Sequence, residues 1–114
     1  MERLTVERVD EILTTRVQKV EFRSPMSCLG RCCPIPGTDQ FLIFIEGEIH
    51  GRGEQIISLI HEIAHIHYGL VLEDGKVVSK VPESTVEDAA LEYIEANPDH
   101  VNLLYERLKN QVLT

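Results

Sequence analysis

The feature that most constrains this 114-residue chain is a pair of histidines, four residues apart, inside an apolar stretch. The stretch is Ile56–His67 and reads Ile-Ile-Ser-Leu-Ile-His-Glu-Ile-Ala-His-Ile-His. Its length and its aliphatic residues predict a helix that is buried on most sides. A helix turns by about 100° per residue, so His61 and His65 project from the same face, one turn apart. Two imidazoles placed in this way can each give a lone pair to one zinc ion.

Glu62 gives the pair a chemical role, because it lies on the flank of the same face. Its carboxylate can reach a zinc-bound water without being a zinc ligand. The pattern His-Glu-x-x-His therefore predicts His61 and His65 as zinc ligands and Glu62 as a general base. The alternative is a core helix whose histidines hydrogen-bond to backbone or carboxylate groups, since buried polar side chains need partners.

Composition limits the class of protein. With 43% apolar and 26% charged residues, the chain is typical of a soluble globular protein, and residues 1–114 are expected to form a single domain. The net charge of −8 argues against a nucleic acid or an anionic membrane as a direct partner. The sequence has neither an apolar run of about 18–20 residues nor the pattern of a signal peptide, so we expect a cytoplasmic protein.

Hydrophobic periodicity predicts an α+β fold made of an N-terminal helix, a short β-sheet, the motif helix, a β-hairpin and two C-terminal helices. Each element is expected to place its apolar residues on one face, which together would form the core. The expected helices are 3–15, 54–68, 84 or 85–96, and a last one that starts at Asn97-Pro98 and buries residues as far as Val112. The expected strands are 17–23, 41–49 and the two arms of a hairpin within 70–78, joined by Asp74-Gly75.

Three cysteines lie in the segment Ser24–Asp39, which three prolines and two glycines predict to be a long loop. An odd number of cysteines in a short cluster is a poor disulfide framework. A structural zinc site would need a second pair of ligands, which is missing. Cys28, Cys32 and Cys33 are therefore interpreted as reduced thiols that are partly buried. A second hypothesis is that one thiolate occupies the open position of the zinc at His61 and His65.

A catalytic zinc would also need a third protein ligand. The six candidates that follow the pair are His67, Glu83, Glu87, Glu92, Glu95 and His100. His67 lies about 200° around the helix from His65 and cannot share the same ion. A glutamate on the next helix could complete a set of two histidines and one glutamate.

The residues of the two helices resemble those of the ImmA/IrrE-type zinc metallopeptidases. The resemblance rests on His61–His65 followed by Val86-Glu87-Asp88-Ala89-Ala90-Leu91-Glu92-Tyr93-Ile94, and it covers about residues 40–98. It implies a zincin-like fold with Glu87 as the third zinc ligand, Ala90 as the small residue between the helices and Tyr93 at the aromatic position. Leu91 stands where the family usually has Asn or Asp, so this chain lacks a polar side chain there that could support the zinc ligands by hydrogen bonds. The chain is also similar in size to soluble minimal gluzincins.

The same resemblance implies a zinc-dependent endopeptidase that cuts a specific protein substrate, such as a regulatory repressor. It also implies that strand 41–49 lines the cleft and can pair with an extended substrate. Tyr68, His67 and His100 are candidate donors to the oxyanion. One alternative is a latent or non-catalytic zinc-binding module whose cleft is blocked by the cysteine loop or the C-terminal segment. Another is a JAMM-type isopeptidase that would use His65 and His67, but no serine follows at the spacing which that class requires. Two histidines and a carboxylate would also accept manganese, iron or cobalt, and the oligomeric state is left open.

Overall fold

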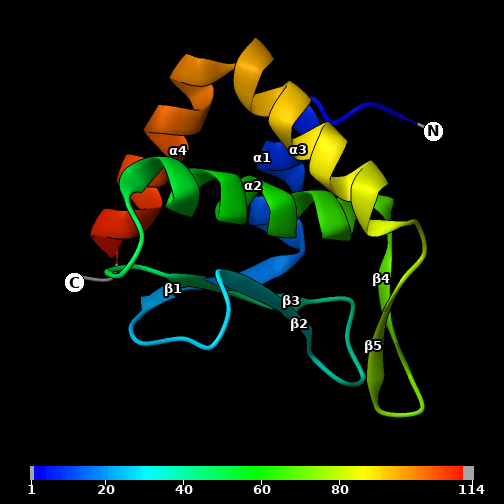
Figure 1. The fold of residues 1–114 in the computed structure, drawn as a ribbon. Coiled ribbons are helices and arrows are strands. Elements are labelled where there is room, and N and C mark those ends of the chain that lie inside the picture. The colour runs from blue at the N-terminus through cyan, green and yellow to red at the C-terminus, as the bar shows by residue number, and fades with distance from the viewer. Residues whose placement is uncertain (1, 112–114) are drawn as a thin grey trace.

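The computed structural model describes residues 2–111 and has all four helices on one side of a three-stranded sheet, with a separate two-stranded hairpin beside it (Figure 1). The α+β class predicted from the sequence is confirmed. The helices are α1 (Val6–Thr15), α2 (Arg52–Tyr68), α3 (Glu83–Ala96) and α4 (Pro98–Gln111). The strands are β1 (Val17–Arg23), β2 (Gly30–Pro34), β3 (Phe41–Glu46), β4 (Leu70–Glu73) and β5 (Lys76–Ser79).

The three-stranded sheet has the order β1-β3-β2, so β3 lies at its centre. Strand β1 runs parallel to β3, whereas β2 is antiparallel to it. Phe41, Ile43 and Ile45 alternate along β3 and are buried, as expected for the face of a sheet that is covered by helices. This face carries helix α2 across its middle (Figure 1).

Helix α2 is the centre of the hydrophobic core, as its composition predicts. Leu59, Ile60, Ile63 and Ala64 are fully buried between the sheet and the other helices. Helix α3 packs on α2 through Val86, Ala90 and Tyr93, and α4 closes the core with Val101, Leu104, Tyr105 and Leu108. The expectation that each of these helices buries one apolar face is confirmed, while Val112 lies outside the described residues.

Two expectations about the segments before α2 are wrong. Residues 30–34 form strand β2 inside the segment predicted to be a continuous loop. This strand is short, lies at the sheet edge and ends in proline, so it lacks the alternating pattern that reveals strands in a sequence. Strand β3 ends at Glu46 and does not continue to Ile49. The Glu46 carboxylate accepts hydrogen bonds from the backbone N–H groups of Glu48 (2.9 Å) and Ile49 (2.7 Å), and these bonds turn the chain away from the sheet.

The starts of three predicted helices differ from the structure, whereas α4 begins at Pro98 as predicted. Helix α1 begins at Val6, because the Thr5 side chain accepts a hydrogen bond from the Arg8 N–H and caps the helix. Helix α2 begins at Arg52 instead of Glu54. Helix α3 begins at Glu83 with Pro82 at its N-cap, so neither Ser84 nor Thr85 is the cap. The last difference places Glu83 in the first turn of α3.

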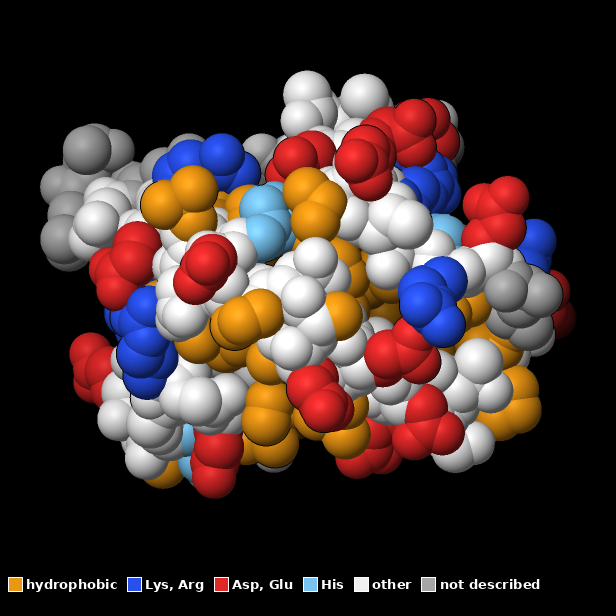
Figure 2. All heavy atoms as spheres, turned by 90° about the horizontal axis from the view of Figure 1, so that it is seen from above, with side chains coloured by type: hydrophobic (Ala, Val, Ile, Leu, Met, Phe, Trp, Pro, Cys, Tyr) orange, Lys and Arg blue, Asp and Glu red, His pale blue; other side chains and the backbone are white. Residues whose placement is uncertain are grey.

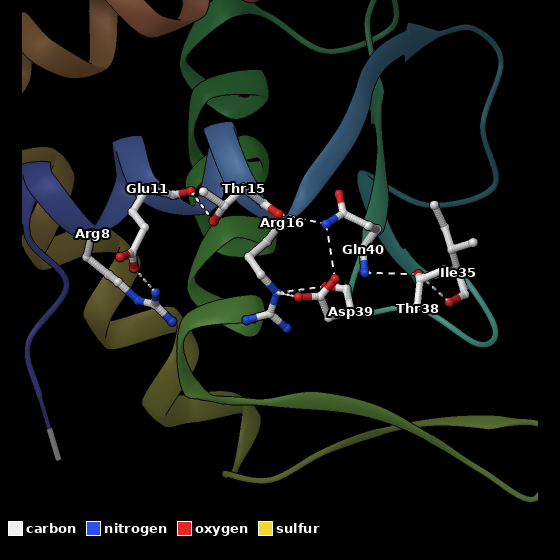
Figure 3. A network of polar contacts seen from close by, with 8 residues as sticks. All are labelled: Arg8, Glu11, Thr15, Arg16, Ile35, Thr38, Asp39 and Gln40. Atoms are coloured by element: carbon white, nitrogen blue, oxygen red, sulfur yellow. Dashed lines mark hydrogen bonds and ion pairs between the residues drawn. The ribbon is translucent and has the colours of Figure 1, made fainter.

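The predicted hairpin is confirmed as β4 and β5, with Asp74 (φ 52°) and Gly75 (φ 76°) in the turn. Both residues take the left-handed conformation that an Asp-Gly turn favours. The turn of the other antiparallel pair, β2 and β3, is tied to the end of α1 (Figure 3). There Gln40 Nε2 donates to the Thr15 carbonyl (2.7 Å) and Arg16 Nε donates to the Asp39 carbonyl (2.7 Å).

The molecular surface reflects the net charge of −8. On the helical face, acidic side chains are spread widely and basic ones form only small groups (Figure 2). Two large apolar side chains on the upper helices are exposed, Leu91 on α3 and Leu103 on α4. Among the described residues, no helix is both long and apolar enough to cross a membrane.

Candidate metal centre

The two histidines of the motif lie together on α2, one helical turn apart. Their ring centroids are 4.9 Å apart, and the side chains of His61 and His65 are 19% and 11% exposed. Ile60, Ile63 and Ile66 are buried and keep the helix packed into the core, while each imidazole keeps a small part of its surface exposed. The structure therefore places both imidazoles where the helical spacing predicts.

A carboxylate from α3 completes a group of three ligating side chains. Glu83 Oε1 lies 2.5 Å from His61 Nε2, and the two Glu83 oxygens lie 3.2 and 3.3 Å from His65 Nε2. All three ligand atoms lie within 4.8 Å of one another, which is compact enough for one ion. Burial would raise the pKa of the Glu83 carboxyl, but the two imidazoles outweigh it, so this pKa lies below its usual value.

The carboxylate at the pair is Glu83 and not Glu87, which the family resemblance implies. Helix α3 runs back over α2 from the hairpin, so its first turn lies beside the end of α2 that carries the histidines (Figure 1). Glu87 lies one helical turn, about 6 Å, further along α3. Its side chain is exposed and does not belong to the group of His61, His65 and Glu83. The sequence signal for Glu83 was its position after Pro82, since proline often precedes the first turn of a helix and acids are favoured there.

Glu62 is buried beside this group, with an exposed fraction of only 8%. Burial raises the pKa of its carboxyl to about 7, and the negative charge of Glu83 adds to the shift. The position matches the flanking place that the motif predicts for a general base. A cation held by His61, His65 and Glu83 would favour the ionised form of Glu62 and oppose this shift.

Strand β2 passes very close to the Glu62 carboxylate at Gly30. An ideal Cβ built on Gly30 would lie 3.3 Å from Glu62 Oε2, 3.3 Å from Ile45 Cδ1 and 3.4 Å from Ser58 Cβ. The absence of a side chain at residue 30 therefore lets the backbone of the edge strand approach the site. Sequence reasoning missed this residue, because it assigned Gly30 to a loop.

Within residues 2–111, β2 is hydrogen-bonded only to β3, so its other edge, which lies near β4, carries no paired strand at the site. Strand β3 is paired on both sides, so the expectation that residues 41–49 can pair with a substrate is wrong. The Glu46 N–H donates to the Leu29 carbonyl, so the backbone groups of Leu29 point toward β3. Along an antiparallel strand, the backbone groups of successive residues point alternately toward the partner strand and away from it. By this alternation, the backbone N–H and C=O groups of Gly30 and Cys32 point away from β3.

The donor set fits a metal ion, but the support of one ligand is incomplete. A histidine that binds through Nε2 carries its proton on Nδ1, which normally donates to a carboxylate or carbonyl. The Nδ1 of His65 is buried and has no hydrogen-bond partner among the described residues. Burial lowers the pKa of the His65 imidazole, an effect that Glu83 opposes and His61 reinforces. The surroundings of His65 therefore favour its neutral imidazole, the form that binds metal.

The three candidate oxyanion donors lie elsewhere. His67 Nδ1 accepts from Arg8 Nε (3.1 Å) and its Nε2 lies 2.9 Å from the Glu2 carbonyl, so both ring nitrogens tie α2 to the N-terminal segment. This geometry also separates His67 from His65 as a ligand pair, which disfavours the isopeptidase alternative. His100 contacts the Tyr93 hydroxyl (2.5 Å) and Asp10 (3.1 Å). Tyr68 lines a surface hollow beside α1 and α3.

The cysteines do not join the converging ligands, within the described part of the chain. Cys32 is buried and faces the site, and burial together with the charge of Glu62 raises the pKa of its thiol. Burial also raises the pKa of the Cys33 thiol, although Arg31 opposes the effect. All three cysteines are free, as interpreted from the sequence. The geometry offers no support for a thiolate that blocks the open position.

Comparisons with models of known protein families, with curated proteins and with solved structures found no match for this chain. The resemblance to ImmA/IrrE-type metallopeptidases therefore stays a prediction from the residues of the two helices.

Proposed function

We propose that this protein is a zinc-dependent endopeptidase that hydrolyses a peptide bond in a protein substrate. The observation that carries the proposal is the convergence of His61, His65 and Glu83 beside the buried carboxylate of Glu62. The set of two histidines and one carboxylate is the one that zinc hydrolases use with an open fourth position. When bound, zinc would supply a Lewis acid that polarises a carbonyl group and makes water a stronger acid.

The residues of the chain have separate roles in the proposed reaction. His61, His65 and Glu83 would hold the ion. Glu62 would accept a proton from the attacking water and deliver it to the leaving amine, which requires one carboxylate close to both atoms. Because the Glu62 side chain is almost fully buried, bulk water has little access to its carboxylate. The water that reaches this carboxylate would enter with the ion or the substrate.

We infer that the substrate binds as an extended segment along the free edge of β2. The outward N–H and C=O groups of Gly30 and Cys32 can pair with a peptide backbone, as edge strands do in other complexes. The close approach of Gly30 to Glu62 would then bring the paired peptide to the carboxylate. The family resemblance adds the hypothesis that the substrate is a regulatory protein such as a repressor. We also propose the cytoplasm, the localisation expected from the sequence, as the place where the protein acts.

A second candidate is a zinc-binding module that does not hydrolyse peptides. It is favoured by one observation: none of the three side chains expected to stabilise an oxyanion lies at the site, because His67 and His100 are engaged elsewhere and Tyr68 faces a different hollow. In this case the chain would bind zinc through the same ligands and use the β2 edge only for recognition.

Metal binding tests the part that both candidates share. Elemental analysis after zinc loading should find about one zinc per wild-type chain, and the ion should be lost in His65→Ala and Glu83→Ala. Glu87→Ala is the matched control and should keep zinc, because its carboxylate lies outside the group. We expect the wild-type affinity to be roughly 10–100-fold below that of sites with a complete hydrogen-bonded shell, because His65 Nδ1 lacks a partner. Zinc retained by Glu83→Ala and lost by Glu87→Ala would overturn this ligand set.

Hydrolysis separates the two candidates. Zinc-loaded protein is incubated with unfolded casein and a pool of fluorogenic peptides, beside the Glu62→Gln variant. A peptidase should release fragments that are absent with Glu62→Gln, while the variant still binds zinc and melts as a folded protein. Equal cleavage by both proteins would indicate a contaminating protease and refute the role of Glu62. Zinc binding without cleavage of any probe would favour the binding module.

A further inference from the structure

We propose that the free edge of β1 pairs with β1 of a second copy of this chain to form an antiparallel two-fold dimer. Strand β1 is seven residues long and pairs only with β3 among the described residues, at the edge of the sheet opposite to β2. An unpaired strand of this length presents a row of free N–H and C=O groups that another strand can satisfy. The metal centre lies beside the other edge, so both edges can be used at once.

The pairing with β3 determines which backbone groups of β1 are free. The Arg23 carbonyl accepts a hydrogen bond from the Gly47 N–H, so the backbone groups of Arg23 point toward β3. Groups alternate along a strand, and those of Val20 and Phe22 therefore point away from the sheet. Two-fold antiparallel pairing of these outward groups can be centred on Val20, on Glu21 or on Phe22.

The charges of β1 exclude one of these registers. A dimer centred on Glu21 would place Glu21 against itself and Lys19 against Arg23 of the other copy, which is repulsive at every charged pair. A dimer centred on Val20 places Lys19 opposite Glu21 twice, and one centred on Phe22 places Glu21 opposite Arg23 twice; opposite charges on facing strands stabilise a sheet. Within Val17–Arg23 the Phe22 register pairs only residues 21–23, whereas the Val20 register reaches both ends of the strand across the irregularity between Val17 and Lys19, so we favour the Val20 register.

Edge strands are often protected by charged side chains, and Lys19 and Arg23 could serve that purpose alone. Protection works when like charges would meet, whereas in the register centred on Val20 Lys19 and Glu21 each meet an opposite charge and Arg23 faces the uncharged Val17. Within one chain these side chains already form ion pairs along the strand, at 3.8 Å for Lys19–Glu21 and 2.7 Å for Arg23–Glu21. Lys19 keeps a side-chain exposure of 62%, so it is free to face a second copy.

The surface next to β1 can add side-chain contact. A hollow of about 460 Å³ lies along the strand, between it and the ends of α1 and α4. Its lining mixes apolar side chains such as Leu13 and Leu108 with polar and basic ones such as Gln18 and Arg107. A second copy that continues the sheet would bring its own β1 against the rim of this hollow, which gives the interface more than a backbone ladder.

The test is a charge exchange read by sedimentation velocity between about 10 µM and 1 mM chain. Wild-type protein should show a monomer–dimer equilibrium. Lys19→Glu and Glu21→Lys should each raise the dissociation constant by about tenfold, because two attractive pairs become repulsive. An equimolar mixture of the two variants should dimerise again, since every pair in the mixed dimer is then opposite in charge. The double variant K19E/E21K should also recover the dimer.

The matched control is Lys76→Glu, which makes the same charge change on the exposed hairpin and should leave the equilibrium unchanged. Because Glu21 also pairs with Arg23 within the chain, thermal melting should establish that Glu21→Lys is folded, and Lys19→Glu tests the proposal independently. A wild-type chain that remains monomeric at 1 mM would overturn the proposal. So would a dimer whose dissociation constant is the same in Lys19→Glu, or a mixture of the two variants that stays monomeric.

Discussion

The close approach of β2 to Glu62 predicts the effect of adding one methyl group at Gly30. The backbone of Gly30 does not need the left-handed conformation, so alanine is allowed there. Its Cβ would meet three neighbours at 3.3–3.4 Å, and each of them would have to move by a few tenths of an ångström. Such overpacking costs about 1–3 kcal/mol, whereas replacing glycine lowers the entropy of the unfolded chain and returns about 0.4–1 kcal/mol. The net expectation is a loss of about 1 kcal/mol.

The matched control is Gly53→Ala on the first turn of α2. A Cβ on Gly53 would meet nothing within 4 Å, and its φ is not positive. The same substitution should therefore stabilise the protein there, by up to about 1 kcal/mol, because alanine favours a helix. Urea denaturation at neutral pH measures both variants, and melting temperatures should move in opposite directions by about 3–5 °C.

A double-mutant cycle tests whether the stability lost in Gly30→Ala comes from the contact with Glu62. In a Glu62→Ala background the carboxylate is gone, so Gly30→Ala should cost less than in the wild type, while its contacts with Ile45 and Ser58 remain. If Gly30→Ala is as stable as wild type while Gly53→Ala stabilises, the backbone of β2 does not lie against Glu62. The inferred path of the substrate along this edge would then lose its support.

Three further predictions concern groups outside the metal centre. Tyr93→Phe should lower the free energy of unfolding, measured in urea, by about 1–2 kcal/mol. The buried hydroxyl contacts His100, and its loss leaves the imidazole without that partner. A change below about 0.3 kcal/mol would argue against the contact. The pKa of Glu46 is lowered by the Ser24 hydroxyl, against the effect of burial, and further by the backbone N–H groups after it. A carboxylate with a lowered pKa stabilises the fold above its unfolded pKa and loses this contribution as the pH falls through the folded value, so wild-type stability should fall from pH 6 to pH 3 more steeply than that of Glu46→Gln. The control Glu48→Gln, at an exposed neighbour, should follow the wild type, and parallel curves for all three proteins would refute the assignment. Finally, a thiol reagent should label Cys28 and Cys33 in the native protein but Cys32 only after unfolding, as read by mass spectrometry. The reason is that Cys32 is 6% exposed and that burial keeps its thiol protonated. Rapid labelling of Cys32 in the native protein would contradict its buried position.

Local features of this protein can be predicted from its residues alone. The apolar run around His61 and His65 is long enough, and regular enough, to predict a buried helix with both rings on one face. The Asp74-Gly75 pair predicts the hairpin, because few residues tolerate the left-handed backbone of its turn. These features depend on neighbours within a few residues along the chain, and periodicity records such neighbours directly.

Which distant groups meet at the site depends on how the helices and strands pack together. The choice of Glu83 over Glu87 depends on where α3 starts and how it crosses α2, which the position of Glu83 after Pro82 does not determine by itself. The strand at Gly30 has no periodic signal, because an edge strand gains its stability from pairing with β3 and not from its own residues. The order β1-β3-β2 likewise decides which edges are free for a partner, since strand order follows from packing across the whole sheet.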